Sequence, residues 1–144
     1  HNENVLMLED DIIINDNASN ILKESINELP EDWGLLYLSG RPKDQTYHFS
    51  KNLIKTNTFL STISYLVNKN YIHSYIDHVL NSLTNPFPNS CADNILNGFF
   101  ANNSYCIYPK IVNPMSGYSV LRFGNRDYEN DWDLDWRQFS PKNT

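Results

Sequence analysis

Three consecutive carboxylates, Glu9, Asp10 and Asp11, are the residues of this chain whose types and spacing could do chemistry. Carboxylates packed this closely repel one another and resist burial unless a cation or hydrogen bonds compensate. Oxygen-only clusters suit hard divalent ions such as Mg²⁺ or Mn²⁺, whose usual partner is a substrate phosphate. The alternative is a solvated loop whose acids face water, and these three residues alone do not decide between the two.

The elements that must position the three acids are a strand before them and a helix after them. Residues 5–8 (Val-Leu-Met-Leu) are too few for a helix face and do not alternate, which predicts a strand buried on both faces, as in a parallel sheet covered by helices. Residues 17–29 are predicted to form an amphipathic helix that Asp16 or Asn17 caps, and residues 35–38 a second buried strand. This order predicts a right-handed βαβ unit with the acids at the carboxyl end of its first strand, where ligands bind in open α/β sheets.

Asp93 is a fourth candidate carboxylate, and two roles are open to it. Ser90 and Asp93 resemble a capping box with Asp in place of Glu, which would make Asp93 a support of a helix N-terminus. A carboxylate in the first turn of a helix, next to a cleft, can also serve as a general base. Arg41 and Lys43 lie in the predicted loop 39–50, at the same end as the acids, and either face a pyrophosphate or are ordinary solvated charges.

Composition limits the class of protein. A chain of 144 residues, 40% hydrophobic and 13% aromatic, is one globular domain's worth, and a net charge of -6 argues against a nucleic-acid-binding surface. No apolar run approaches the roughly 20 residues needed to cross a membrane. Cys91 and Cys106 predict two buried thiols in a reducing compartment, with the cytoplasm favoured, and one disulfide is the alternative. The chain begins at His1 and soon enters a predicted core strand, which suggests a piece of a longer protein.

Several motifs follow one another along the chain in a distinctive order. They are residues 6–11 (Leu-Met-Leu-Glu-Asp-Asp), 32–38 (Asp-Trp-Gly-Leu-Leu-Tyr-Leu), 52–54, 64–67, 91–96 and 108–109. Together they resemble the family-25 glycosyltransferases, which include bacterial lipooligosaccharide galactosyltransferases and procollagen galactosyltransferase-like proteins of animals and giant viruses. The resemblance extends over most of the chain, from residue 4 to about residue 120. The acidic triplet alone is a weak signal, and the triplet followed by the 32–38 motif is fairly specific.

The resemblance implies a fold. The chain would be an α/β protein with part of a GT-A-like fold, a mixed, mostly parallel sheet flanked by helices. It would form a single glycosyltransferase-like domain over residues 1–144 that lacks the family's first strands, which hold the nucleotide base and ribose.

The resemblance also implies an activity, which is metal-dependent transfer of galactose or glucose, with inversion, from a UDP-sugar to a hydroxyl of a glycan or protein acceptor. By matching position, Asp11 would be a direct ligand of Mn²⁺ or Mg²⁺ together with Glu9, while Glu9 and Asp10 would face the donor's sugar or ribose. Asp93 would be the general base. Enzymes with a GT-A fold often complete the metal shell with a His late in the chain. No His follows His78 here, so Asn113 or Asp127 would take that place.

Two further hypotheses compete with glycosyltransferase activity. The first is a non-catalytic glycosyltransferase-like module that binds a sugar or a partner protein. The second is a phosphatase-like or receiver-like α/β domain that uses the acid cluster. That hypothesis requires a downstream Lys and a phosphorylatable Asp in fixed order, which the sequence does not place.

Overall fold

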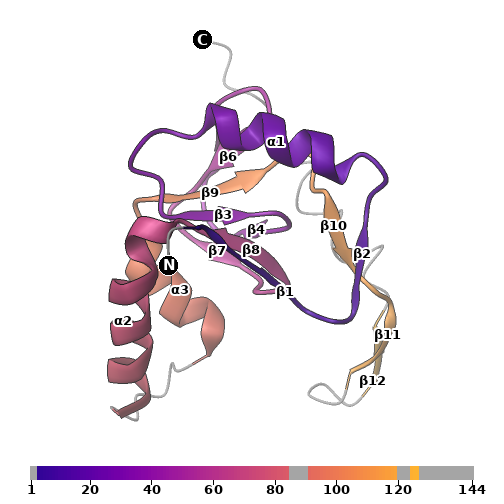
Figure 1. The fold of residues 1–144 in the computed structure, drawn as a ribbon. Coiled ribbons are helices and arrows are strands. Elements are labelled where there is room, and N and C mark those ends of the chain that lie inside the picture. Colours follow the sequence, from indigo (N-terminus) through magenta and orange to yellow (C-terminus); the bar gives the residue numbers. More distant parts are fainter. Residues whose placement is uncertain (1–2, 85–90, 120–123, 127–144) are drawn as a thin grey trace.

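The computed structural model describes residues 3–84, 91–119 and 124–126, and its centre is a six-stranded sheet with helices on both faces. The strand order is β1 (Val5–Leu8), β8 (Ser64–Val67), β3 (Leu35–Tyr37), β9 (Ser104–Ile107), β6 (Leu53–Lys55) and β5 (Tyr47–His48). Helix α1 (Ala18–Glu28) covers one face, and helices α2 (Ile72–Thr84) and α3 (Ala92–Phe100) cover the other (Figure 1). The mixed α/β class expected from the sequence is therefore confirmed.

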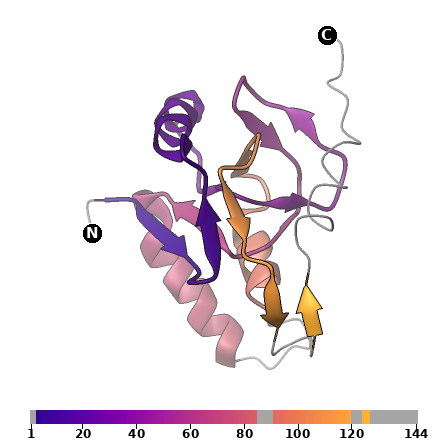
Figure 2. The ribbon, with the colours of Figure 1, turned by 90° about the vertical axis from the view of Figure 1, so that its right-hand side faces the viewer.

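Short paired strands surround this sheet. They are β2 (Ile12–Ile14) with β10 (Val112–Pro114), β4 (Arg41–Pro42) with β7 (Phe59–Leu60), and β11 (Gly117–Ser119) with β12 (Gly124–Arg126). A 3₁₀ turn, η1 (Lys69–Tyr71), leads into α2. Figure 2 shows β2 and β10 lying side by side, so the chain that follows the acidic triplet pairs with the chain that follows β9.

The prediction of a mostly parallel sheet is wrong. Within the described residues, β3 and β9 are the one parallel pair of the sheet, and its other pairings are antiparallel. β1 and β3 do run in the same direction, as a βαβ unit requires, but β8 lies between them and pairs with both. The physical reason is that helices bury both faces of the central strands whatever their direction, so continuous apolar runs do not distinguish the two kinds of sheet.

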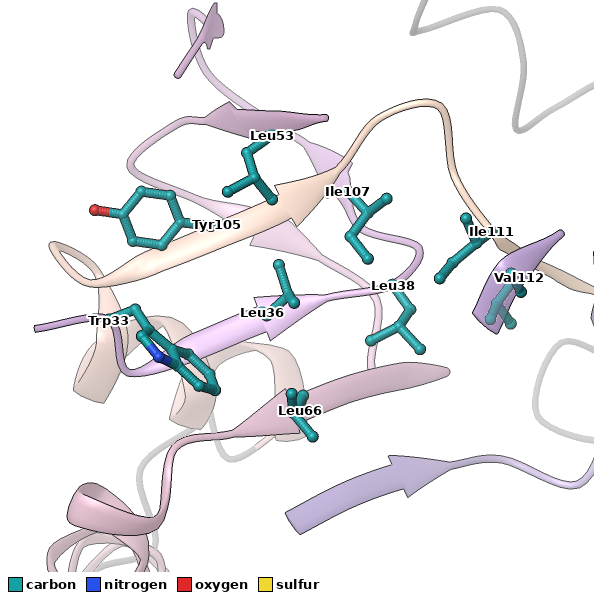
Figure 3. Close-up of a cluster of buried hydrophobic side chains, with 10 residues drawn as sticks. Trp33, Leu36, Leu38, Leu53, Leu66, Tyr105, Ile107, Ile111 and Val112 are labelled. Atoms are coloured by element: carbon teal, nitrogen blue, oxygen red, sulfur yellow. The ribbon is translucent and has the colours of Figure 1, made fainter. Parts of the chain in front are cut away.

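Two apolar clusters hold the helices to the sheet. Along each strand, successive side chains point to opposite faces of the sheet, so each strand contributes to both clusters. The cluster beneath α1 is drawn in Figure 3, which labels Trp33, Leu36, Leu38, Leu53, Leu66, Tyr105, Ile107, Ile111 and Val112. The cluster beneath α2 and α3 includes Leu35, Tyr37, Leu96 and Phe100. Each fully buried large side chain contributes about 1.5–3 kcal/mol. The two clusters therefore fix the helices on opposite faces of one sheet.

β1 lies at the edge of this sheet and is much more exposed than the sequence predicts. Leu6, Met7 and Leu8 are 45%, 46% and 43% exposed, so the expectation of a strand buried on both faces is wrong within the described chain. The reason is that β8 pairs with one edge of β1, and no described strand pairs with the other. The four residues of β1 thus combine the composition of an internal strand with an edge position.

Asparagines are the N-caps of two helical segments. Asn68 caps the turn before α2, because its side-chain oxygen accepts a hydrogen bond from the Asn70 N–H at 2.9 Å. Asn17 is the N-cap of α1 but makes no side-chain capping bond. Cys106 is buried as expected, whereas Cys91 is exposed, and both thiols are free. No helix among the described residues has the length and apolar character needed to span a membrane.

We expect Gly34→Ala to lower the free energy of unfolding by about 1–3 kcal/mol, because the new methyl group would lie 2.6 Å from Phe100 Cδ1. Gly98→Ala is the matched control. Its methyl group would meet nothing closer than His78 Nε2 at 3.8 Å, and Gly98 lies within α3, so this change should raise stability by about 0.5–1 kcal/mol. Urea-induced unfolding measures both changes, and equal effects would contradict the packing of α3 on the end of β3.

Candidate functional site

The acidic triplet lies where the sequence places it, at the carboxyl end of β1. Glu9, Asp10 and Asp11 are exposed and form the turn between β1 and β2. The Glu9 N–H donates to the Ile63 carbonyl at 2.9 Å, and the Asp11 carbonyl accepts from the Met115 N–H at 2.8 Å. The backbone of the triplet is therefore fixed at both ends, while its carboxylates remain in contact with solvent.

The segment that enters β8 lies beside the triplet. β1 and β8 are antiparallel with Leu8 opposite Ser64, so the residues just before Ser64 reach the carboxyl end of β1. The Thr62 hydroxyl donates to Glu9 Oε1 at 3.2 Å. Both the backbone and the side chain of Glu9 are thus tied to residues Thr62 and Ile63.

Asp93 contacts the same segment from the other side. It lies in the first turn of α3, is half-buried, and its Oδ1 accepts a hydrogen bond from the Ser61 N–H at 3.1 Å. The capping-box prediction is wrong in register, because the N-cap of α3 is Cys91 and makes no side-chain capping bond. Ser90 lies outside the described residues. The carboxylate of Asp93 therefore binds the backbone of the segment that leads into β8.

Ser61 and Thr62 each hydrogen-bond to a carboxylate from a distant part of the sequence. Glu9 bonds to Thr62, and Asp93 bonds to its neighbour Ser61. Ser61 has a φ of 101°, a left-handed conformation that a non-glycine residue holds only when its surroundings impose it. Neither residue stands out in the sequence. Strained backbone conformations cluster at ligand sites, so this segment is a candidate part of a binding site.

Asn97 is a third group that sequence reasoning missed. Its Nδ2 donates to the Phe59 carbonyl at 2.6 Å, and its Oδ1 accepts from the Phe59 N–H at 3.1 Å. Asn97 lies four residues after Asp93, so both side chains leave the same face of α3. That spacing was the available signal, since two polar residues on one helix face can together hold an adjacent strand.

Burial sets the proton affinity of Asp93. Desolvation raises the pKa of its carboxyl group above the ordinary value, against the opposing hydrogen bond from Ser61. A carboxylate with a raised pKa is a better proton acceptor at neutral pH than an ordinary aspartate. The position and proton affinity of Asp93 are both suited to a general base.

Three tyrosines lie on the α2–α3 side of the sheet near these carboxylates. Burial raises the pKa of Tyr37, and the negative charge of Asp93 raises it further. Burial likewise raises the pKa of Tyr65, to which the charge of Glu9 adds, and the pKa of Tyr75 is raised to about 12. The Tyr37 side chain is fully buried, and the Tyr65 and Tyr75 hydroxyls hydrogen-bond to each other, so the three hydroxyls belong to the interior on this face of the sheet.

The three acids of the predicted metal site do not form a metal-holding group by themselves. Among residues 3–84, 91–119 and 124–126, no three His, Cys, Asp or Glu side chains form a group that could hold a metal ion. Asn113 donates its side-chain amide to Asn15 at 3.0 Å, and Asp127 lies outside the described residues. Mg²⁺ is commonly bound by one or two carboxylates together with substrate phosphates. Glu9 and Asp11 are exposed, and their binding of such an ion stays a prediction.

Two cations lie at the same edge. Arg41 and Lys43 are exposed and follow β3, whose carboxyl end lies at the same edge as that of β1. Arg41 pairs with Leu60, the residue before Ser61. Their contact with a pyrophosphate stays a prediction.

Comparison with protein-family models, with curated proteins and with solved structures finds no match to this chain. Its function is therefore inferred from its own residues and their geometry.

We expect the stability difference between the wild-type protein and Asp93→Asn to depend on pH. The raised pKa means that the folded protein holds the Asp93 proton more tightly than the unfolded chain, so this group favours folding below 3.8 and loses that contribution as the pH rises through the folded value. Asparagine keeps an oxygen for the Ser61 N–H and does not titrate. Urea-induced unfolding from about pH 3.5 to about pH 7 should show the wild type losing stability relative to the variant. Asp77→Asn, on the exposed face of α2, controls for the loss of one charge; a difference independent of pH for Asp93→Asn would contradict the burial.

We expect Ser61→Gly to raise the free energy of unfolding by about 1 kcal/mol, because glycine adopts the left-handed conformation without steric cost. Ser74→Gly, at an exposed position of α2, is the control and should lower stability by about 0.5 kcal/mol. Thermal or urea unfolding measures both. A loss of stability in Ser61→Gly as large as that in the control would contradict a strained Ser61.

Proposed function

We propose that this chain is the acceptor-side part of a metal-dependent glycosyltransferase. It would transfer galactose or glucose, with inversion, from a UDP-sugar to a hydroxyl of a glycan or protein. The observation that carries the proposal is that Glu9 and Asp93 bond to consecutive residues, Thr62 and Ser61, beside the carboxyl ends of β1 and β3. Ligands bind outside the carboxyl ends of strands in open α/β sheets, and an inverting transfer needs a base for the acceptor hydroxyl.

The chemistry assigns a separate task to each carboxylate. In an inverting transfer the acceptor oxygen bonds to the anomeric carbon, the bond from that carbon to the diphosphate oxygen breaks, and UDP leaves with the electron pair. Asp93 would accept the proton that the acceptor hydroxyl loses, a role that its raised pKa favours. Glu9 and Asp11 would hold a Mn²⁺ or Mg²⁺ ion, which when bound supplies positive charge to the departing diphosphate. Asp10 and Glu9 would contact the donor's sugar or ribose.

The exposed edge of β1 supports the acceptor-side assignment. Leu6, Met7 and Leu8 have the composition of a strand inside a larger sheet, and β8 pairs with only one of the strand's two edges. The resemblance implies additional strands that hold the nucleotide. Such strands would add beside β1 and bury those three side chains.

The alternative is a glycosyltransferase-like module that binds a sugar or a partner without catalysis. The exposed apolar side chains of Leu6, Met7 and Leu8, which a partner protein could cover, favour it. A receiver-like domain is excluded, because that fold has a parallel doubly wound sheet and this sheet is mostly antiparallel.

Calorimetric titration of UDP-galactose and UDP-glucose, with and without Mn²⁺, tests the proposal. We expect binding that requires Mn²⁺ and that weakens by about 10-fold or more in Asp11→Ala, as is usual for the loss of a metal-site carboxylate or its support. Asp77→Asn, far along the exposed face of α2, should bind like the wild type. Asp93→Asn should also bind the donor normally, because its proposed role concerns the acceptor.

The outcomes separate the hypotheses. Binding only by a chain extended at its N-terminus would support an enzyme whose nucleotide half lies outside these 144 residues. Absence of binding by both forms would contradict the catalytic proposal and leave the binding module.

A further inference from the structure

We propose that the free edge of β1 pairs with β1 of a second copy of this chain, so that two six-stranded sheets join across a twofold axis. Within the described residues, β8 pairs with one edge of β1 and no strand pairs with the other. Unpaired strand edges are templates for pairing with another chain. The inference does not rest on the proposed function, because it involves no metal ion, donor or acceptor. A chain that carried further strands beside β1 would not form this dimer.

The backbone groups of β1 that point away from β8 belong to Leu6 and Leu8. The Glu9 N–H donates to the Ile63 carbonyl, so these two residues form a hydrogen-bonded pair between the strands. Opposite residues of an antiparallel pair alternate between bonded and non-bonded pairs, so Met7 also bonds to β8, whereas Leu6 and Leu8 do not. The N–H and C=O groups of both leucines are therefore directed to the free edge.

The side chains of β1 are apolar on both faces of the sheet. Leu6 lies opposite Leu66 of the cluster beneath α1, so Leu6 and Leu8 project on that face. Met7 lies opposite Tyr65, which packs against the cluster beneath α2 and α3. The three side chains are 43–46% exposed. A strand that is apolar on both faces covers them best, and β1 itself is such a strand.

The same features set the register of the pairing. Residues that lie opposite each other must share a face, and the bonded residues of both strands must be those with free backbone groups. Pairing Leu6 with Leu8 of the second copy meets both conditions and places Met7 opposite its own copy on the twofold axis. A shift by two residues would place a leucine opposite Asn4 or Asp10. The register centred on Met7 therefore buries the most apolar surface.

Helix α2 adds an exposed apolar stripe that consists of Ile76, Leu80 and Leu83. These side chains are 48%, 56% and 65% exposed and lie three and four residues apart, so they form one line along the helix. On the other side of α2, Tyr75 and His78 contact Phe99 of α3. Because α3 packs beneath the interior strand β3, the stripe is turned toward the edge that β1 forms. A stable dimer buries about 800 Å² per partner, and the stripe supplies surface that a four-residue strand lacks.

Charges at the ends of the pairing are partly complementary. In this register Asp10 lies opposite Asn4 of the second copy, whose side chain accepts the Lys69 N–H at 2.9 Å. Lys69 thus brings a cation beside the acidic triplet and offsets the repulsion between Asp11 and Glu3, which also lie opposite each other. These groups are exposed, so they help to fix the register and add little to the affinity.

Charge-swapped variants of Met7 test the proposal, because pairing with a second copy in this register places residue 7 opposite itself. We expect the wild-type chain, without metal or nucleotide, to sediment as a dimer that dissociates on dilution. Met7→Lys and Met7→Glu should each weaken dimerisation about 10-fold or more, because two like charges meet on the axis. An equimolar mixture of the two variants should restore the dimer as a heterodimer.

Two further variants complete the experiment. Tyr47→Lys, at the opposite edge of the sheet, is the matched control, because Tyr47 is 47% exposed and Met7 is 46% exposed. It should dimerise like the wild type. Leu80→Gln should weaken dimerisation, since it removes apolar surface from the stripe on α2. Circular dichroism should show that all variants fold.

Three results would overturn the pairing. They are a wild-type chain that stays monomeric at the concentrations used for NMR, Met7 variants that dimerise like the wild type, and a mixture that forms no heterodimer. Slow hydrogen exchange of the Leu6 and Leu8 amides in a monomer would also overturn it, because another occupant, such as residues 127–144, would then cover the edge. Wild-type dimerisation of Leu80→Gln would overturn the part assigned to α2. None of these results bears on donor binding, so the proposed function would stand.

Discussion

The pairing of β8 with β1 on one side and β3 on the other is the constraint on which the rest of the structure depends. Because β8 is antiparallel to both, its first residue lies at the edge where β1 and β3 end. The chain that leads into β8 must therefore pass directly beside the acidic triplet. Both apolar clusters hold this arrangement in place, since β8 contributes Leu66 to one and Val67 to the other.

The strained entry into β8 follows from this constraint. A residue in a sparsely populated conformation lowers the free energy of unfolding by about 1–3 kcal/mol. A hydrogen bond to a charged group raises it by about 1.5–3 kcal/mol. The bond from the Ser61 N–H to Asp93 is thus of the size needed to offset the conformation of Ser61. Asp93 accordingly has a structural task in addition to the role of general base that we propose for it.

Local patterns in the sequence are sufficient to predict the individual elements. The apolar runs locate β1 and β3, the amphipathic pattern of residues 17–29 locates α1, and the triplet falls at the end of β1 as expected. Strand order could not be predicted in the same way, because it depends on pairing between distant residues and short apolar runs do not specify that pairing. The insertion of β8 between β1 and β3, and the exposure of Leu6 and Leu8 that accompanies an edge position, could not be read from the pattern. Ser61 and Thr62 were missed for the same reason, since their importance arises only when β8 brings them to Glu9.

We propose that Glu9 and Asp11 form one side of a diphosphate–metal site whose other side is the segment bonded to Asp93. Anomalous X-ray scattering from crystals grown with Mn²⁺ and UDP would locate the ion. We expect one Mn²⁺ ion in contact with a carboxylate of Glu9 or Asp11 and with the diphosphate, and the Ser61–Asp93 hydrogen bond preserved. UDP bound elsewhere, or Mn²⁺ bound away from both carboxylates, would contradict it.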